Sequence, residues 1–167
     1  LKRLYEEEII PEMFIETVLV HLFKKNDPRL PSNYRFLHMR RDISRLFELL
    51  IYLKLESHFD THTADSQMGC RKMGDTTEHL AMLGSIIKDR EDNGAGIVIT
   101  AIDCQKCFDV SHLTDNQACL QMEGADKKAL KVLYKYQKRN KIRVKGSKEQ
   151  FVIDDGIGQG GVPAARM

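Results

Sequence analysis

The sequence predicts an α+β fold, and three stretches carry that prediction. Asp42 is followed by apolar residues at helical spacing, Ile97–Ile102 is an uncharged and mostly β-branched run, and Lys141–Lys145 alternates between cationic and apolar residues. The first pattern is typical of an amphipathic helix, the second of a strand buried on both faces, and the third of a half-exposed strand. The 167 residues suffice for one domain, or for one and a half.

The first forty residues predict a short helix and two strands. An acidic helix covers residues 4–10, ahead of Pro11. Residues 16–23 favour a strand through their Thr-Val-Leu-Val core, although their length also permits a helix. A charged turn with two prolines then leads to a second strand over residues 34–39.

Two helices follow, separated by a polar loop over residues 57–75. The first begins at Asp42 and ends near Glu56, and its apolar face carries Ile43, Leu46, Phe47, Leu50 and Ile51. Asp75 with Glu78 predicts a capping box for the second helix. Leu80, Leu83 and Ile87 share one face of that helix, which ends at a glycine-containing turn over residues 93–96.

After the Ile97–Ile102 strand we expect two more helices and a hairpin. The helices cover residues 113–122 and 126–139, with Gly124 between them. Residues 141–145 and 150–153 form the hairpin around Gly146-Ser147. The chain then reaches a glycine-rich run, Gly156–Gly161.

Charge is balanced overall but unevenly distributed. The net charge of +2, with 42% hydrophobic and 30% charged residues, is typical of a soluble globular protein. Residues 127–148 contain ten Lys or Arg and no acid, whereas Glu6–Glu8 is an acidic cluster. The basic stretch has two readings that are compatible: contacts to nucleic-acid phosphates, or the solvated face of an amphipathic helix. In the second reading the inward residues are Ala129, Leu130, Leu133 and Tyr136.

The four cysteines predict free thiols in a reducing compartment, because the chain shows no signal peptide and no apolar span of membrane length. Cys104-x-x-Cys107 resembles half of a zinc or redox site. A zinc site needs a second pair, and Cys70 and Cys119 are isolated, so we do not favour that reading.

Asp103 is the main candidate for chemistry. It follows the apolar run directly, and a carboxylate at the end of a buried strand is costly unless it is paired, hydrogen-bonded or metal-bound. The sequence alone leaves two alternatives open: a metal ligand, or an Asp that caps the next turn.

Five stretches in order resemble the reverse transcriptases of non-LTR (LINE-like) retrotransposons. They are Phe23-Lys24-Lys25-Asn26-Asp27 with Asn33-Tyr34-Arg35, then Arg45-Leu46-Phe47-Glu48, Gln67-Met68-Gly69-Cys70-Arg71-Lys72 with Thr76, Asp103-Cys104-Gln105-Lys106-Cys107-Phe108-Asp109, and Gly158-Gln159-Gly160-Gly161-Val162. The resemblance covers residues 9–167. The departures are Phe36 for the usual Pro, Cys70 for Phe, Cys107 for Ala, and Ala164-Ala165 for Ser-Pro.

The resemblance implies the fingers and part of the palm of a right-hand polymerase. Residues 1–95 would be fingers, 96–112 the palm strand with its catalytic Asp, 113–153 fingers and palm helices with a basic hairpin, and 154–167 the start of a second palm segment. The family's paired catalytic aspartates lie in a later motif, which this sequence does not include. We therefore expect little or no polymerase activity from these 167 residues alone.

The resemblance also implies roles for individual residues. Asp103, with the backbone carbonyl of Cys104, would bind Mg²⁺, with Mn²⁺ as an alternative ion. Phe108 would exclude the 2′-hydroxyl of a ribonucleotide, and Gln159 with Gly160 would lie beside the incoming nucleotide. Without the resemblance, Phe108 is an ordinary core residue and the glycine-rich run an ordinary loop.

Cations would bind the phosphates. Lys24, Lys25 and Arg35 would hold the triphosphate, although a Lys-Lys turn is usually only solvated surface. The nucleic-acid contacts would come from the basic stretch, namely Lys127, Lys128, Lys131, Lys135, Lys138, Arg139, Lys141 and Arg143.

The expected partners are an RNA template, a DNA primer and deoxynucleoside triphosphates, without a membrane. The expected compartment is intracellular, cytoplasmic or nuclear. Two other hypotheses stay open: a nucleic-acid-binding module without catalysis, and a degenerate relic that does not fold stably.

Overall fold

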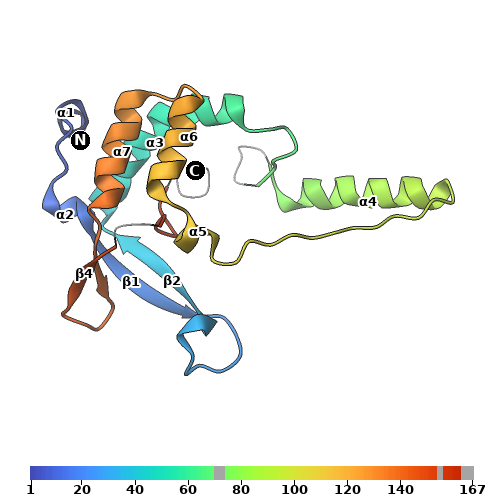
Figure 1. The fold of residues 1–167 in the computed structure, drawn as a ribbon, viewed down its shortest axis with the longest axis horizontal. Helices are drawn as coiled ribbons and strands as arrows, with labels where there is room; N and C mark the ends of the chain where they lie inside the picture. Colours follow the sequence, from blue (N-terminus) through green and yellow to red (C-terminus); the bar gives the residue numbers. More distant parts are fainter. Residues whose placement is uncertain (70–73, 154–155, 163–167) are drawn as a thin grey trace. The chain divides into compact units, whose positions relative to one another are not determined.

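The fold contains a four-stranded mixed sheet, and several helices gather beyond one end of its two long strands (Figure 1). The computed structural model describes residues 1–69, 74–153 and 156–162. The strands are β1 (Glu16–Phe23), β2 (Tyr34–Arg40), β3 (Lys141–Val144) and β4 (Gln150–Val152). Their order in the sheet is β2-β1-β3-β4, with β1 antiparallel to β2 and parallel to β3, and β3 antiparallel to β4. The predicted α+β class is confirmed, and residues 16–23 form a strand.

Along the chain, short helices precede β1, and a run of helices lies between β2 and β3. The helices are α1 (Lys2–Glu6), α2 (Glu12–Ile15), the 3-10 turn η1 (Pro31–Asn33), α3 (Asp42–His62), α4 (Thr76–Asp92), α5 (Cys107–Val110), α6 (Leu113–Met122) and α7 (Lys127–Lys138). No helix in the described ranges combines the length and the apolar character needed to cross a bilayer. The predicted helices at 113–122 and 126–139 and the hairpin at 141–153 are confirmed to within a residue or two.

The chain divides into two compact units. Leu1–Phe59 and Lys106–Met167 form the first, which contains the whole sheet, and Asp60–Gln105 forms the second. Residues 70–73, 154–155 and 163–167 lie outside the described residues. They include Cys70, Arg71 and Lys72 of the motif stretches, Ala164-Ala165, and much of the predicted segment 154–167.

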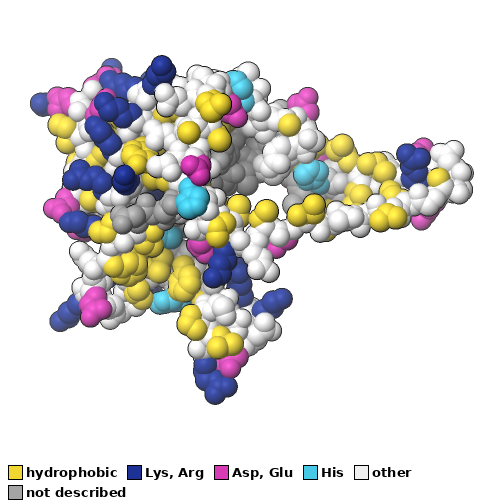
Figure 2. Space-filling model, viewed as in Figure 1, with side chains coloured by type: hydrophobic (Ala, Val, Ile, Leu, Met, Phe, Trp, Pro, Cys, Tyr) yellow, Lys and Arg dark blue, Asp and Glu magenta, His cyan; other side chains and the backbone are white. Residues whose placement is uncertain are grey.

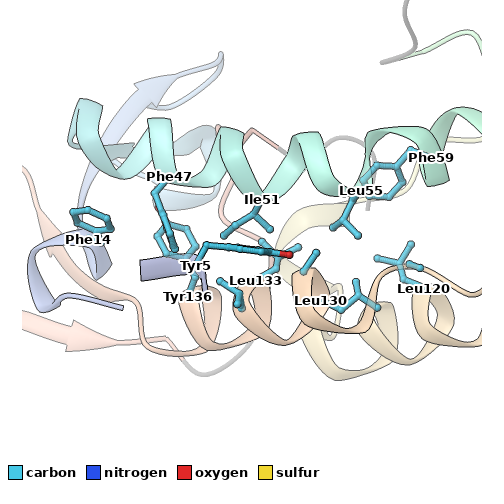
Figure 3. Close-up of a cluster of buried hydrophobic side chains, with 13 residues drawn as sticks. Tyr5, Phe14, Phe47, Ile51, Leu55, Phe59, Leu120, Leu130, Leu133 and Tyr136 are labelled. Atoms are coloured by element: carbon cyan, nitrogen blue, oxygen red, sulfur yellow. The ribbon is translucent and has the colours of Figure 1, made fainter. Parts of the chain in front are cut away.

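The core of the first unit lies between α3 and α7 (Figure 3). The side chains of α7 predicted to point inward, Ala129, Leu130, Leu133 and Tyr136, are all buried. Rings from other segments complete the cluster: Tyr5 of α1, Phe14 of α2, and Phe47 and Phe59 of α3. Phe14 packs on Phe47 with ring centroids 5.5 Å apart, and Phe47 lies 6.0 Å from Tyr136.

Helix α3 buries a face that overlaps the predicted one but is displaced from it: Phe47 and Ile51 are buried as predicted. Ile43 and Leu46 are exposed, and the buried stripe consists of Ser44, Phe47, Glu48, Ile51, Leu55 and Phe59. A pattern of apolar residues alone missed part of this face because two of its members are polar. Phe59 adds one more buried turn, so the helix continues to His62 through residues predicted to be loop.

In the second unit, the cap of α4 agrees with the prediction. The Asp75 carboxylate accepts hydrogen bonds from the backbone N–H groups of Thr77 and Glu78, at 2.7 and 2.9 Å. These bonds satisfy two of the donors that a helix N-terminus leaves free. None of the described side chains of α4 is fully buried.

The predicted buried strand at Ile97–Ile102 is wrong. This segment has no regular secondary structure, and its side chains are exposed, with Val98 at 92%. A β-branched run becomes a strand only when its backbone N–H and C=O groups pair with a neighbour, and no described strand pairs with it. Asp103 therefore follows an exposed, extended segment rather than a buried strand.

Candidate functional site

A pocket of about 230 Å³ opens in the first unit beside β2. It is lined by α5, the start of α6, the end of α7, β3 and the glycine-rich run. Its polar and aromatic side chains are His38, Phe108, Asp109, Gln137 and Asn140. Ligand pockets usually have volumes of roughly 300–1,000 Å³, so this one suits part of a ligand, such as one ring.

The glycine-rich run forms one wall of the pocket through backbone contacts. The N–H of Ile157 donates to the carbonyl of Phe108 at 2.8 Å, and the N–H of His38 donates to the carbonyl of Gln159 at 3.0 Å. Gly156 has a φ of +87°, which disfavours a side chain there. A Cβ on Gly161 would lie 2.8 Å from Oε1 of Glu48. These glycines are needed because the run packs directly on α5, β2 and α3.

A buried ion pair supports this wall from behind. Arg40 Nη1 donates to Glu48 Oε1 at 2.6 Å, and the two side chains are only 3% and 1% exposed. The guanidinium also lies 4.9 Å from the ring centre of Tyr136 and 3.5 Å from both Thr17 Oγ1 and Asn140 Oδ1. Because Asn140 lines the pocket, the ion pair and the pocket share one hydrogen-bonded network.

His38 presents a neutral imidazole to the pocket. Burial lowers its pKa below the usual 6.5, and the nearby Arg40 charge lowers it further. Its Nδ1 is buried without a hydrogen-bond partner among the described residues. Burial also raises the pKa of Tyr136 to about 12, so that side chain stays neutral.

Of the predicted nucleotide-binding residues in the described ranges, Phe108 lines this pocket, and two others follow its lining residue Gly158 in the chain. These two, Gln159 and Gly160, belong to the run along its wall. Gly160 also approaches β2, where an added Cβ would lie 3.5 Å from the carbonyl oxygen of His38. The fold thus joins two predicted elements, α5 and the glycine-rich run, that are far apart in sequence.

The predicted triphosphate-binding cations lie elsewhere in the same unit. Lys24 and Lys25 follow β1, and Arg35 lies opposite Leu22 near the same end of the β1–β2 hairpin. His38 pairs with Leu19, so at the usual strand rise Lys24 is roughly 15 Å along the hairpin from the pocket. Arg35 also points to the sheet face opposite to His38, because side chains alternate along a strand.

Asp103 and Cys104 belong to the second unit, where both are exposed. Within residues 1–69, 74–153 and 156–162, no three His, Cys, Asp or Glu side chains gather as a metal-binding group. Cys104, Cys107 and Cys119 carry free, exposed thiols.

Half of the cations predicted to bind nucleic acid are paired with N-terminal acids. Lys128 contacts Glu6 at 2.8 Å, and Lys131 and Lys135 both contact Glu8 at 2.7 Å. Lys141 forms a further ion pair with Glu12. Hydrogen bonds from Lys131 and Lys135 lower the pKa of Glu8 to about 2. We call these seven residues the α7 clasp.

The other four cations differ in their surroundings. Lys138 donates to the hydroxyl of Tyr134 at 2.9 Å. Lys127, Arg139 and Arg143 are exposed and form no ion pair with a described residue. The acidic cluster and the basic stretch, read separately in the sequence, thus partly neutralise each other. Their complementary charge was the signal for this contact.

Sequence reasoning missed His38, Arg40, Glu48 and Asn140 as parts of the site. Charged residues are assigned to the surface by default, because they are seldom fully buried unless paired. One signal was present: Glu48 lies four residues after Ser44 and three before Ile51, on the stripe that α3 buries. Arg40 and His38 also share one face of β2.

No family model matches this chain, and no curated protein matches it at the level searched.

Proposed function

We propose that this chain forms fingers and part of the palm of a reverse transcriptase of the non-LTR retrotransposon type. The observation that carries the proposal is the 2.8 Å hydrogen bond from Ile157 to the carbonyl of Phe108. It joins two segments that the resemblance assigns to one nucleotide site, and both segments line the same pocket.

The chemistry of the pocket supports a role in binding a sugar or base. It offers the Phe108 ring, a neutral imidazole, and the amides of Gln137 and Asn140. Asp109 also lines it, and a carboxylate repels phosphate. In the proposed role, Phe108 packs against the sugar and leaves no room for a 2′-hydroxyl.

Asp103 is the proposed ligand of the catalytic Mg²⁺, with the carbonyl of Cys104 beside it in the chain. Both groups supply oxygen donors, the kind that Mg²⁺ and Mn²⁺ take, so the donor set fits the ion. In nucleotidyl transfer, bound divalent ions activate the attacking hydroxyl and neutralise charge on the leaving pyrophosphate. Asp103 is exposed and therefore able to hold such an ion.

The test is discrimination between dGTP and GTP by the 167-residue chain in the presence of Mg²⁺. We expect tighter binding of dGTP, and we expect Phe108→Ala to bring the two affinities together because the ring no longer excludes the 2′-hydroxyl. The control is Phe151→Ala, which removes a half-exposed ring of β4 that does not line the pocket. Equal binding by the original chain would contradict the proposal.

The role of Asp103 needs a separate test. In a longer polypeptide that synthesises DNA on an RNA template, Asp103→Asn should abolish primer extension, because a neutral amide is a much poorer ligand for Mg²⁺. Normal extension by that variant would remove Asp103 from the mechanism.

The second candidate is a nucleic-acid-binding module without catalysis. It is favoured by the three exposed cations Lys127, Arg139 and Arg143, and it needs neither triphosphate nor metal. Filter binding to an RNA–DNA hybrid across a salt series separates the two functions. A module of this kind binds the hybrid with steep salt dependence and shows no preference between dGTP and GTP.

A further inference from the structure

Four aromatic side chains form a ladder on one face of the β1–β2 hairpin. His21 and Phe23 of β1 lie opposite Phe36 and Tyr34 of β2. Ring centroids are 5.3 Å apart for His21–Phe36, 6.3 Å for His21–Tyr34 and 5.4 Å for Phe23–Tyr34. The four rings thus make one continuous zigzag across the two strands. We call these residues the aromatic ladder.

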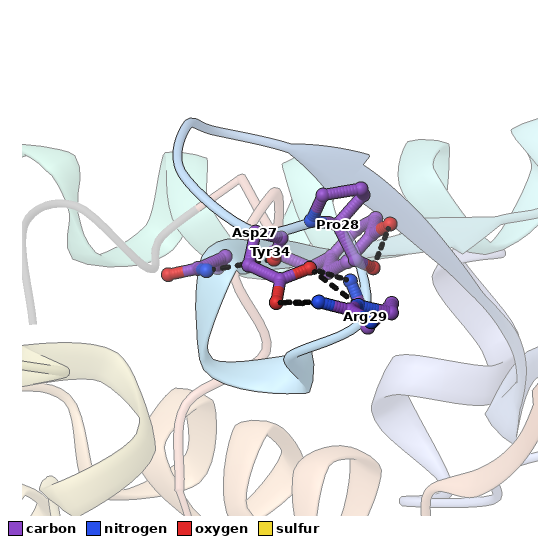
Figure 4. A network of polar contacts seen from close by, with 5 residues as sticks. Asp27, Pro28, Arg29 and Tyr34 are labelled. Atoms are coloured by element: carbon purple, nitrogen blue, oxygen red, sulfur yellow. Dashed lines mark hydrogen bonds and ion pairs between the residues drawn. The ribbon is translucent and has the colours of Figure 1, made fainter.

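The ladder is partly open to solvent and held in place at its end. His21 is exposed, and Phe23 is 47% exposed. The Tyr34 hydroxyl donates to the carbonyl of Pro28 at 2.7 Å, which fixes that ring against the connecting loop (Figure 4). Side-chain hydrogen bonds also hold the loop itself. The Asn33 side chain donates to the carbonyl of Asp27 at 2.8 Å, and the Arg29 guanidinium donates two hydrogen bonds to the Asp27 carboxylate.

Two lysines lie at the loop end of this ladder. Lys24 and Lys25 follow Phe23 directly, whereas Arg35 lies between Tyr34 and Phe36 in the chain and points to the opposite face of the sheet. None of the three forms an ion pair with a described residue. The nearest acid in the loop, Asp27, is already bound to Arg29 at 3.0 Å. Figure 2 shows Lys and Arg side chains gathered at the tip of this projecting lobe. The surface is therefore both aromatic and positively charged.

The ladder continues the β2 wall of the pocket. Tyr34, Phe36 and His38 alternate on one face of β2, and His38 lines the pocket that also holds Phe108. Along the strand, Phe36 is only about 7 Å from His38. A ligand lying on the ladder would thus reach the pocket at one end and the cationic tip at the other.

We propose that the ladder and the hairpin cations bind single-stranded nucleic acid. Successive bases stack on His21, Phe23 and Phe36, while Lys24 and Lys25 contact the phosphodiester backbone. Stacked rings beside a cationic track are the common way to bind a single strand without reading its sequence. A duplex fits poorly, because its bases are already stacked on one another. This inference deepens the proposed function, since the bound strand would lead into the Phe108 pocket.

The test is fluorescence anisotropy of the 167-residue chain with labelled oligo(U), oligo(dT) and their duplex, in EDTA and without triphosphate. We expect both single strands to bind more tightly than the duplex. His21→Ala and Phe23→Ala should each weaken binding about tenfold, the usual effect of removing one stacking ring. Lys25→Ala should reduce the slope of log affinity against log salt by about one.

Leu22→Ala is the matched control. Leu22 is 50% exposed and lies between His21 and Phe23, but it points to the opposite sheet face. Its removal should leave affinity unchanged. Phe23→Leu, which keeps an apolar side chain without a ring, should weaken binding as Phe23→Ala does.

Three results would overturn the inference: preference for the duplex, unchanged affinity in Phe23→Ala, or an equal loss in Leu22→Ala. Tighter binding of oligo(U) than of oligo(dT) would assign the surface to an RNA template, and the reverse order to a DNA strand. This assay contains no Mg²⁺ and no triphosphate. A negative result would therefore contradict single-strand binding by the ladder, but it would not bear on the nucleotide pocket, which the dGTP test addresses.

Discussion

The α7 clasp and the β1–β2 hairpin are both rich in cations, but their cations have different surroundings. In the clasp, Lys128, Lys131, Lys135 and Lys141 each contact a glutamate of the N-terminal segment. At the hairpin, Lys24, Lys25 and Arg35 form no ion pair with a described residue, and Lys24 and Lys25 directly follow the aromatic ring of Phe23. The denser run of positive charge in the sequence is thus the more neutralised surface. A cation count identifies a binding surface only after its acidic neighbours are known.

The largest expected effect concerns the buried ion pair between Arg40 and Glu48, and it tests how much the folded state depends on that pairing. Glu48→Ala should destabilise the protein by about 3–5 kcal/mol, because Arg40 is left buried without its carboxylate. Denaturant unfolding monitored by circular dichroism measures this. Replacing both partners with Met and Leu should recover most of the loss, since an apolar pair leaves no buried charge. If Glu48→Ala were as stable as the original chain, the pair would not be buried in solution.

The next prediction removes acidic partners from the α7 clasp, so that its lysines become unpaired like those of the β1–β2 hairpin. Removing the acidic charges in Glu6→Gln/Glu8→Gln frees Lys128, Lys131 and Lys135. The salt slope of nucleic-acid binding should then become steeper by about two, because each new phosphate contact releases counterions. Anisotropy across a salt series measures the slope. An unchanged slope would mean that these lysines reach nucleic acid without releasing their glutamates.

The pH dependence of the clasp gives a smaller effect with a definite sign. The pKa of Glu8 falls from 4.5 to about 2 in the folded protein, through hydrogen bonds from Lys131 and Lys135. A lowered folded-state pKa means that the stabilisation is present above pH 4.5 and is lost as the pH falls toward 2. The melting temperature of the original chain should therefore approach that of Glu8→Gln across this range. A constant difference between the two down to pH 2 would exclude Glu8 as the titrating group.

The smallest effect concerns the loop that connects β1 to β2. Asp27→Asn removes the exposed ion pair with Arg29 but keeps a side chain that can hydrogen-bond the loop. Exposed pairs contribute little to stability, so the melting temperature should barely change, while single-strand affinity should rise because Arg29 becomes free to contact phosphate. Lower affinity in this variant would indicate that the Asp27–Arg29 bond shapes the binding surface.

The sequence predicted well those elements whose own residues carry the full pattern of apolar and polar positions, without help from a partner element. Helix α7 has all its apolar residues on one face, so both its bounds and its inward side chains were correct. Helix α3 was predicted with its buried face displaced, because Ser44 and Glu48 lie on that face and are polar. The Ile97–Ile102 strand failed because a strand depends on a partner that its own residues do not specify.

The site was predictable only in part, for a similar reason. Phe108, Gln159 and Gly160 came from a motif resemblance, whereas Arg40 and Asn140 become site residues only through a network that joins β2, α7 and α3. The aromatic ladder required the register of β1 against β2. That register depends on the conformation of the ten-residue connection from Lys24 to Asn33, which propensity does not fix.

The parallel pairing of β1 with β3 has a consequence for synthesis of the chain. Glu16 pairs with Lys141, so β1 finds its second neighbour only after the long segment between β1 and β3 has been synthesised. At usual rates of translation this takes on the order of ten seconds. Until then β1 and β2 can form only a hairpin, with one edge of β1 open to pairing with other chains. Newly made protein should therefore depend on chaperones that shield strand edges until β3 arrives.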